Sequence, residues 1–514
     1  MDILMFVIAL VLFLLLIPIV IIFKVIKHSN ANDRAKVRSE QHVDRLPEHA
    51  LSWKMPIKQT TFLFSLVIAG FLCSLVGLSR IYLTTIGNGD FFVLEVIPLP
   101  YWIGITLIAV ATFLSIKYAG RKGATTLSLV SSIIFMACIR MVFPIVYPTP
   151  AIYEPDVLNY MPVVDSWARS GINLGFSGLY QHDYPMSFVL AFIFVKLGVS
   201  VNTFFRVAPF FVYATEVVLL YLICTEIFPE DKRYSAAAAF LFSLSPQNYW
   251  ISVHYCPDLI GSLFYFLSLY LVIRYVKRGL GNLRNLALVC LSILALMLSH
   301  HLSMTYFIVT MIGFAVSAKF LKIKGKDLGF FILAVFSYTV WFIYGHFMYP
   351  GFFDVYVYFT GFAGPIIRAQ GMGLYDSFLF LVFPAFITIL FIFGTVILLG
   401  VHSFSDMMKL LRKPRNLLMK NQGAITPFEF SFGFVMIAFL FVVGFAVPVL
   451  QSIRILEVLL IGVYPISARA FIKMFGSNSS KKWVIVLLCI ATVLVMFIGV
   501  GRYYRQIQRR VLFP

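Results

Sequence analysis

Residues 204–226 read FFRVAPFFVYATEVVLLYLICTE, an apolar run that carries Arg206 near its start, Glu216 in its middle and Glu226 at its end. A helix that crosses a bilayer needs about 20 mostly apolar residues, and this run is long enough. A charged residue inside such a run is costly unless it has a partner. We expect Glu216 to pair with Arg140 in a structural role. The stretch therefore predicts a membrane-spanning helix.

Apolar runs of similar length occur along most of the chain. Of its 514 residues, 61% are hydrophobic and 12% are charged, whereas soluble domains have roughly 45–50% apolar and about 25% charged residues. This balance excludes a soluble enzyme, a secreted disulfide scaffold, a coiled coil and a disordered protein, and predicts an all-α polytopic membrane protein with about 14 transmembrane helices. The predicted spans are 2–23, 60–79, 98–116, 125–147, 204–226, 235–251, 258–274, 285–300, 302–319, 328–347, 376–400, 430–450, 455–473 and 483–500.

The positive charges orient these spans. Of the 41 Lys and Arg residues, 30 fall on one set of alternate loops, with the largest group in 24–58. Lys and Arg are enriched on the cytoplasmic side of membrane proteins, so these loops are predicted to be cytoplasmic. The net charge of +19 is then explained by a basic surface that faces anionic lipid, and no nucleic-acid partner is expected. The six cysteines show no CxxC spacing and are expected to be small core residues.

Two outer loops are long, 148–203 and 348–375. The first is rich in aromatic residues, glycine and proline, and long loops of this kind are commonly functional. It ends in an apolar stretch at 186–199, which is short for a span and typical of a helix that lies in the membrane interface. Asp165 and Arg169 are spaced as a local helical ion pair.

Polar groups gather on the same outer side. Five of the nine histidines fall there: His182, His254, His300, His301 and His346. Acids, imidazoles and isolated arginines at membrane depth indicate a catalytic or transport cavity at the outer surface. Simpler explanations stay open at this stage: Asp258 follows Pro257 as a helix-start residue, the paired histidines could satisfy helix-end carbonyls, and Arg454 could extend to lipid headgroups.

An ordered set of segments over residues 148 to about 280 resembles the GT-C superfamily of integral membrane glycosyltransferases, in the branch of the protein O-mannosyltransferases and the lipid A aminoarabinose transferase. The segments are EPDVLNYMPVVDSWARSG, HDYPMSFVLAFIFVKLGVS, FFRVAPFFVYATEVVLLYL and PEDKRYSAAAAFLFSLSPQNYWISVHYCPDLIG, and farther on SIRILEVLLIGVYP. No single segment is specific, but their order is. The resemblance implies a GT-C-like fold whose first large outer loop is catalytic.

The same resemblance implies three parts of the chain. They are N-terminal transmembrane helices in 1–124, a catalytic transmembrane core in 125–347, and C-terminal transmembrane helices in 348–514.

The resemblance also implies a sugar donor carried on polyprenyl or dolichyl phosphate and transferred with inversion to a glycan, lipid or protein acceptor. Asp156 is the expected base that takes the acceptor proton. Cationic groups would stabilise the departing phosphate. The predicted site residues are Asp156, Glu154 and Asp183 for catalysis; Arg454, His300, His301 and Arg206 for the donor phosphate; and His182, Tyr184, His254, Asp258 and Arg368 for the acceptor or for support.

The chain departs from the family pattern at two places. The adjacent acidic pair is split by proline in Glu154-Pro155-Asp156, and a Lys of the family's His-Lys-Pro-Pro region is absent from His182-Asp183-Tyr184-Pro185. The second departure shifts phosphate binding towards Arg206, the histidines or Arg454. No cofactor is required by the sequence, although a divalent Mg or Mn is an open alternative with Asp156, Asp183 and His254 as candidate ligands.

A transporter or flippase for lipid-linked or anionic saccharides is the rival interpretation. Such proteins show internal repeats and polar residues at mid-membrane, and we find no repeat and few mid-span charges. Cysteines without disulfide spacing and the absence of a signal-peptide pattern fit a multi-pass protein of a prokaryotic plasma membrane. The active site is expected to face outside.

Overall fold

The computed structural model describes most of the chain between residues 57 and 348. The described residues are 57–84, 98–119, 123–140, 142, 144, 157–172, 184–229, 231–244, 255–278, 283–320, 326–348, 464, 465, 467–469, 471 and 472. Over these residues the regular elements are helices, as the sequence predicted. They are α2 (Ile57–Thr84), α4 (Leu99–Lys117), α5 (Ala124–Arg140), α7 (Val157–Ser170), α9 (Pro185–Lys196), α10 (Val201–Ile227), α11 (Lys232–Ser243), α13 (Pro257–Arg278), α14 (Leu283–Met297), α15 (His301–Phe320) and α16 (Lys326–Met348).

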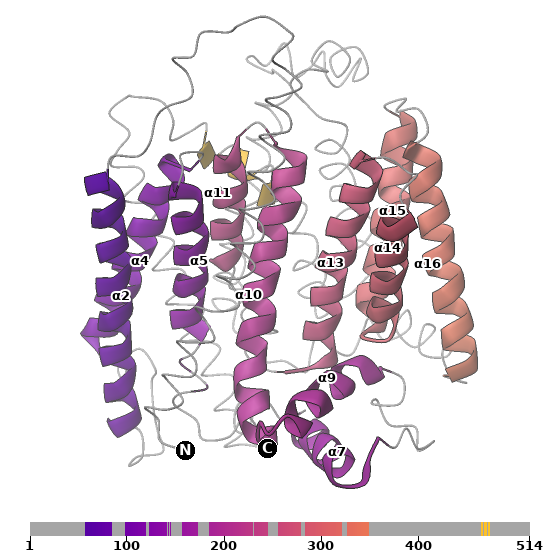
Figure 1. The fold of residues 1–514 in the computed structure, drawn as a ribbon, viewed down its shortest axis with the longest axis horizontal. Helices are drawn as coiled ribbons and strands as arrows, with labels where there is room; N and C mark the ends of the chain where they lie inside the picture. Colours follow the sequence, from indigo (N-terminus) through magenta and orange to yellow (C-terminus); the bar gives the residue numbers. More distant parts are fainter. Residues whose placement is uncertain are drawn as a thin grey trace, which may run out of the picture.

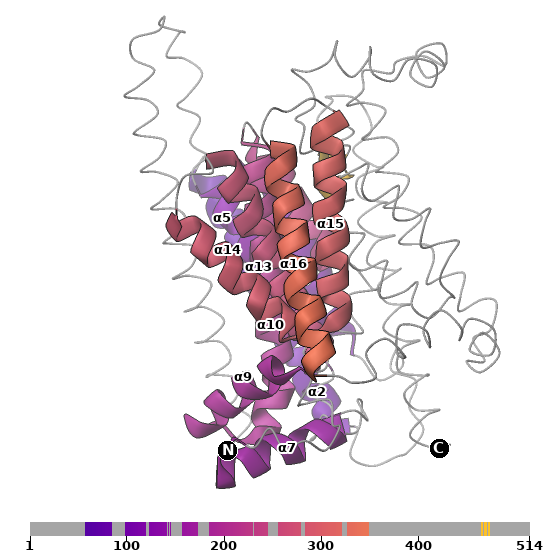
Figure 2. The same cartoon turned by 90° about the vertical axis from the view of Figure 1, so that its right-hand side faces the viewer.

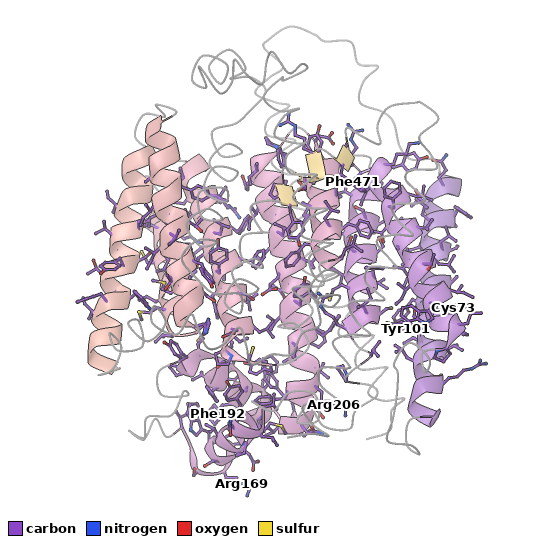
Figure 3. All side chains as sticks on the ribbon, turned by 180° about the vertical axis from the view of Figure 1, so that it is seen from behind. Cys73, Tyr101, Arg169, Phe192, Arg206 and Phe471 are labelled. Carbon is purple, nitrogen blue, oxygen red and sulfur yellow. The ribbon has the colours of Figure 1, made fainter. Side chains whose placement is uncertain are left out.

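Most of these helices run side by side in one bundle, whereas α7 and α9 lie across one end of it (Figures 1 and 2). The predicted outer loop supplies both crossing helices, so we call this end the outer end. The short apolar helix that the sequence predicted at 186–199 is confirmed as α9. Figure 3 places Arg169, Phe192 and Arg206 towards this end and Phe471 towards the opposite one.

Four described helices are long and apolar enough to cross a membrane: Gln59–Arg80, Leu99–Lys117, Val201–Ile227 and Pro257–Val276. This finding supports an integral membrane protein. The count of about 14 transmembrane helices stays a prediction, because the spans expected at 2–23, 376–400, 430–450 and 483–500 lie outside the described residues.

One predicted span is shorter than expected. The sequence predicted a helix over 235–251, but α11 has 12 residues and its C-cap is Leu244. Pro246 follows two residues later. Proline has no N–H to donate and disfavours helical backbone in the residue before it, which explains why α11 ends here.

Small residues let α2 and α4 pack closely. A Cβ atom on Gly70 would lie 2.7 Å from the carbonyl oxygen of Gly104, and one on Gly77 would meet the backbone of Tyr101. Glycine and serine at such contacts are typical of helix pairs inside membranes. On its other side α2 exposes Phe62, which suits contact with lipid.

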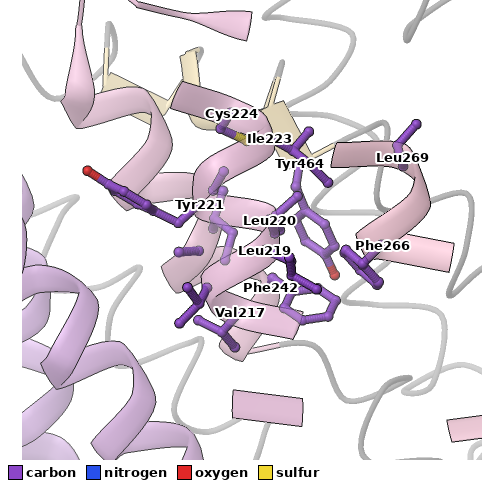
Figure 4. Packing of buried hydrophobic residues seen from close by; sticks show 14 of the residues in the cluster. Val217, Leu219, Leu220, Tyr221, Ile223, Cys224, Phe242, Phe266, Leu269 and Tyr464 are labelled. Atoms are coloured by element: carbon purple, nitrogen blue, oxygen red, sulfur yellow. The ribbon is translucent and has the colours of Figure 1, made fainter. Parts of the chain in front are cut away.

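The core of the bundle forms around α10. Tyr213 stacks on Phe242 of α11 with ring centroids 4.9 Å apart, and Phe242 meets Phe266 of α13 edge to face at 5.4 Å. Tyr464, from the C-terminal part of the chain, packs against the same Phe242 ring at 5.6 Å. Figure 4 shows this packing. The core therefore joins helices on both sides of α10 to the 464–472 segment.

A tight turn joins α9 to α10. Gly198 has φ of +95°, a conformation that side chains disfavour, and its N–H bonds the carbonyl of Val195. Ser200 then caps α10 by accepting a hydrogen bond from the Thr203 N–H at 3.2 Å. At this turn the chain changes direction: α9 crosses the outer end, and α10 runs along the bundle away from it.

Candidate functional site

The helix α9 is docked on the outer end of the bundle by two hydrogen bonds. The Met186 N–H donates to the Leu298 carbonyl at 3.1 Å, and the Tyr255 hydroxyl donates to the Ser187 carbonyl at 2.6 Å. Burial raises the pKa of Tyr255 well above its usual range, so this hydroxyl keeps its proton. These bonds bring the start of α9, the entry to α13 and the end of α14 to one place.

The helix α7 completes this region. Its Trp167 and Tyr160 rings contact Phe188 of α9, with ring centroids 6.0 and 5.5 Å apart. The predicted pair of Asp165 and Arg169 is confirmed as an exposed ion pair on the opposite side of α7. The amphipathic helix thus turns its aromatic side to the bundle and its charges outward.

Asp258 and His300 meet at the centre of this outer region. His300 Nε2 lies 2.5 Å from Asp258 Oδ1, and His300 is buried while Asp258 is only partly so. Asp258 stands in the first turn of α13, as the Pro257-Asp258 pattern predicted. His300 stands immediately before α15. An aspartate that accepts the N–H of an imidazole fixes the ring's orientation.

The other nitrogen of His300 is also engaged. Its Nδ1 lies 3.3 Å from the hydroxyl oxygen of Ser303. A neutral imidazole that donates from Nε2 to Asp258 leaves Nδ1 free to accept the Ser303 proton. The ring is therefore held from both sides, which favours a role in orientation and charge stabilisation over a role as an unengaged base.

Close helix contact makes this pairing possible. A Cβ atom on Gly261 would lie 2.6 Å from both the His300 Cβ and the Ser303 Oγ. Only a glycine at this position of α13 lets the helix approach the start of α15 so closely. Tyr184, at the start of α9, also lies near the imidazole, and the centroids of the two rings are 6.0 Å apart.

Arg206 lies in the second turn of α10, also towards the outer end (Figure 3). One of its terminal nitrogens donates to the carbonyl oxygen of Pro144, beyond the end of α5. The predicted role of Arg206 in phosphate binding stays a prediction.

The remaining predicted site residues are not placed. Those outside the described residues are Glu154, Asp156, His182, Asp183, His254, Arg368 and Arg454, together with the side chain of His301. All three candidate metal ligands are in this group. Among the described residues, no group of three His, Cys, Asp or Glu side chains could hold a metal ion. Their roles, including any metal site, stay predictions.

The sequence indicated Asp258 and His300 as separate site residues but did not predict that they pair. It also gave no sign that Ser303 and Gly261 contact His300. The two paired residues are separated by the whole of α13 and α14, and no local pattern links them. The topology was the one indication that the two residues could be close, since both were predicted at the outer ends of neighbouring spans.

Comparisons with known proteins give one family match and a similar solved structure. Residues 182–342 match a family described as dolichyl-phosphate-mannose-protein mannosyltransferase, which confirms the resemblance to GT-C integral membrane glycosyltransferases. The matched segment contains α9 to α15 and most of α16, and with them Tyr184, Asp258 and His300.

Among solved structures, the chain is similar to an archaeal oligosaccharyltransferase, AglB from Archaeoglobus fulgidus, in complex with an inhibitory peptide and a dolichol-phosphate. The identity is 13% and the TM-score 0.42, over 74% of this chain and 56% of that one. The chain thus spans little more than half of that relative's length. No curated protein gives a significant match.

Proposed function

We propose that this protein is a membrane glycosyltransferase that moves a sugar from a polyprenyl- or dolichyl-phosphate carrier to an acceptor at the outer face of the membrane. The family match over residues 182–342 supports the class of donor. The buried pairing of Asp258 with His300 inside that matched segment is the observation that carries the proposal. It supplies an imidazole of fixed orientation where the helices meet the predicted outer loop.

The residue that follows Asp156 in the chain lies in this outer region. This residue, Val157, begins α7 and is fully buried in one apolar cluster with Leu259, the neighbour of Asp258. The two backbones therefore reach the same outer region. In the proposed mechanism Asp156 takes the proton of the acceptor hydroxyl as that oxygen attacks the anomeric carbon from the side opposite the phosphate, which inverts the configuration.

The departing phosphate needs positive charge or hydrogen-bond donors. We assign this role to Arg454 and Arg206, with His301 in support. The His300 imidazole, oriented by Asp258, contributes positive charge when it is protonated. The aromatic side of α7 and the helix α9 cover the region and limit the access of water.

Transfer of labelled sugar from a polyprenyl-phosphate donor tests this function, using the full chain in nanodiscs with a membrane extract as the source of acceptor. Asp156→Asn should abolish transfer, whereas Asp165→Asn, which removes only the exposed pair with Arg169, should leave it near wild type. Wild-type turnover in Asp156→Asn would remove this carboxylate from the mechanism. Proteoliposomes that move the labelled donor across the bilayer without any transfer would support the rival transporter function instead.

A further inference from the structure

A second polar cluster lies deeper in the bundle. The carboxylate of Glu216, in the middle of α10, is 2% exposed and accepts a hydrogen bond from the Ser262 hydroxyl of α13. Arg140, the last residue of α5, is equally buried, and its pairing with Glu216 stays a prediction. Its guanidinium carbon lies 3.8 Å from the centroid of the Tyr213 ring. We call these four residues the Glu216 cluster.

This cluster ties four helices together. Arg140 belongs to α5, Glu216 and Tyr213 to α10, and Ser262 to α13. The Tyr213 hydroxyl also donates to the Phe242 carbonyl of α11 at 3.1 Å. Apolar packing has little directional preference, whereas contact between the Ser262 hydroxyl and Glu216 favours one rotation of α13 against α10. The same hydroxyl also lies 2.9 Å from the Leu259 carbonyl of its own helix.

The same rotation sets the outer site. Ser262 follows Asp258 by four residues on α13, so the two side chains share a face and stand about 6 Å apart along the helix axis. Gly261, between them, faces His300 and Ser303. A turn of α13 that broke the bond from Ser262 to Glu216 would therefore also move Asp258 away from His300.

Stability alone does not explain this cluster. Burying polar groups adds little net stability even when they are hydrogen-bonded, and a well-attested use of such groups is to select one arrangement of helices. A charged side chain inside a membrane span is costly and is expected to have a specific role. In this bundle the arrangement that the cluster selects is the one that pairs Asp258 with His300.

We propose that Glu216 is a positioning residue for the outer site: it fixes α13 through Ser262 and so keeps the Asp258 carboxylate on His300. The effect on sugar transfer rests on the proposed function. The effect on His300 itself does not.

Ser262→Ala tests the link with the smallest change, because it removes the bond to α13 and leaves Arg140 and Glu216 in place. In the transfer assay we expect kcat to fall by about tenfold with the donor KM within about twofold. The control is Ser292→Ala on α14, a buried hydroxyl that bonds the Val289 carbonyl of its own helix. This control should keep wild-type kinetics.

A double-mutant cycle separates positioning from general loosening of the fold. If Ser262 acts through Asp258, then Ser262→Ala should change kcat by less than about twofold in the Asp258→Asn background. Additive losses would mean that Ser262 does not act through Asp258, and would overturn the proposal. Glu216→Gln, which keeps a side-chain oxygen that can accept from Ser262, should keep kcat within about twofold of wild type.

Chemical modification of His300 gives a readout that does not depend on activity. Diethyl pyrocarbonate acylates an unprotonated imidazole nitrogen, and fragment masses distinguish His300 from His301. The wild-type ring, 3% exposed with both nitrogens engaged, should react slowly. Ser262→Ala should speed this reaction about fivefold, and Ser292→Ala should not.

The two readouts separate the two proposals. Faster modification in Ser262→Ala with no transfer by the wild-type chain would reject the proposed function and keep the positioning role. Active wild-type protein with unchanged modification and unchanged kcat in Ser262→Ala would reject the positioning role and keep the function.

Discussion

His300 and Asp258 form a contact of 2.5 Å between the junction of α14 with α15 and the first turn of α13. The Nδ1 of the same ring lies 3.3 Å from the Ser303 hydroxyl, so the imidazole has one preferred orientation. Removing one partner from such an arrangement costs free energy, because a buried polar group without a partner has lost its hydration and gains no hydrogen bond in return.

Asp258→Asn should lower transfer more than it lowers stability. The amide oxygen can still accept the Nε2 proton but carries no negative charge, so we expect kcat to fall by about 10-fold to 100-fold. The unfolding free energy should fall by about 1–3 kcal/mol. Kinetics of labelled transfer and thermal unfolding in detergent measure the two effects. Equal turnover by mutant and wild type would show that the charge of Asp258 has no part in transfer.

Gly261→Ala should damage the site through contact rather than charge. The added methyl group would lie 2.6 Å from His300 and Ser303, and overpacking of this kind costs about 1–3 kcal/mol. Gly104→Ala makes the same change where α4 meets Ser74 and Gly70 of α2, away from the site.

Both glycine variants should unfold at lower temperature, but only Gly261→Ala should reduce the specific activity of the folded fraction. Activity and unfolding are measured on the same preparations. An equal loss of specific activity in both variants would argue against a special role for Gly261.

Tyr255→Phe should loosen the docking of α9. It removes the hydroxyl that donates to the Ser187 carbonyl at 2.6 Å and leaves that buried carbonyl without this donor, at a cost of about 1–3 kcal/mol. Hydrogen exchange of the α9 amides should accelerate. Tyr101→Phe removes a similar bond to the Cys138 carbonyl at 3.0 Å and is the control, because it should destabilise the bundle without selective exposure of α9. Unchanged exchange in Tyr255→Phe would mean that other contacts hold the helix.

Much of this fold follows from the sequence. Apolar runs of sufficient length predicted α10 and α13 within a few residues, and the short run before Lys196 predicted α9 as a separate helix. Periodicity and length suffice here because a helix in a membrane must satisfy its own backbone hydrogen bonds. The span predicted over 235–251 is confirmed as helix only to Ser243, and Pro246 lies in the interior of the predicted range.

The site was less predictable, for physical reasons. The sequence placed Asp258 and His300 at one membrane surface, but their contact depends on the rotation of two helices and on the missing side chain of Gly261. Helix rotation is set by packing across the bundle, to which many distant residues contribute. From the sequence, Asp258 could therefore also be interpreted as a helix-start residue. Its contact with His300 is seen only in the three-dimensional structure.

Arg206 provides the last prediction, because its two possible contributions can be separated. Its bond to the Pro144 carbonyl is structural, while its predicted contact with the donor phosphate is electrostatic. Arg206→Lys keeps the charge and Arg206→Gln loses it, and neither keeps the planar fork of the guanidinium. We expect Gln to raise the donor KM about tenfold, as the loss of a charge-assisted bond of roughly 1.5–3 kcal/mol would, and Lys to raise it less. Arg169→Gln, which removes an exposed charge from α7, should leave KM unchanged. If Lys and Gln instead lowered thermal stability equally at constant KM, the role of Arg206 would be confined to holding the segment after α5 against α10.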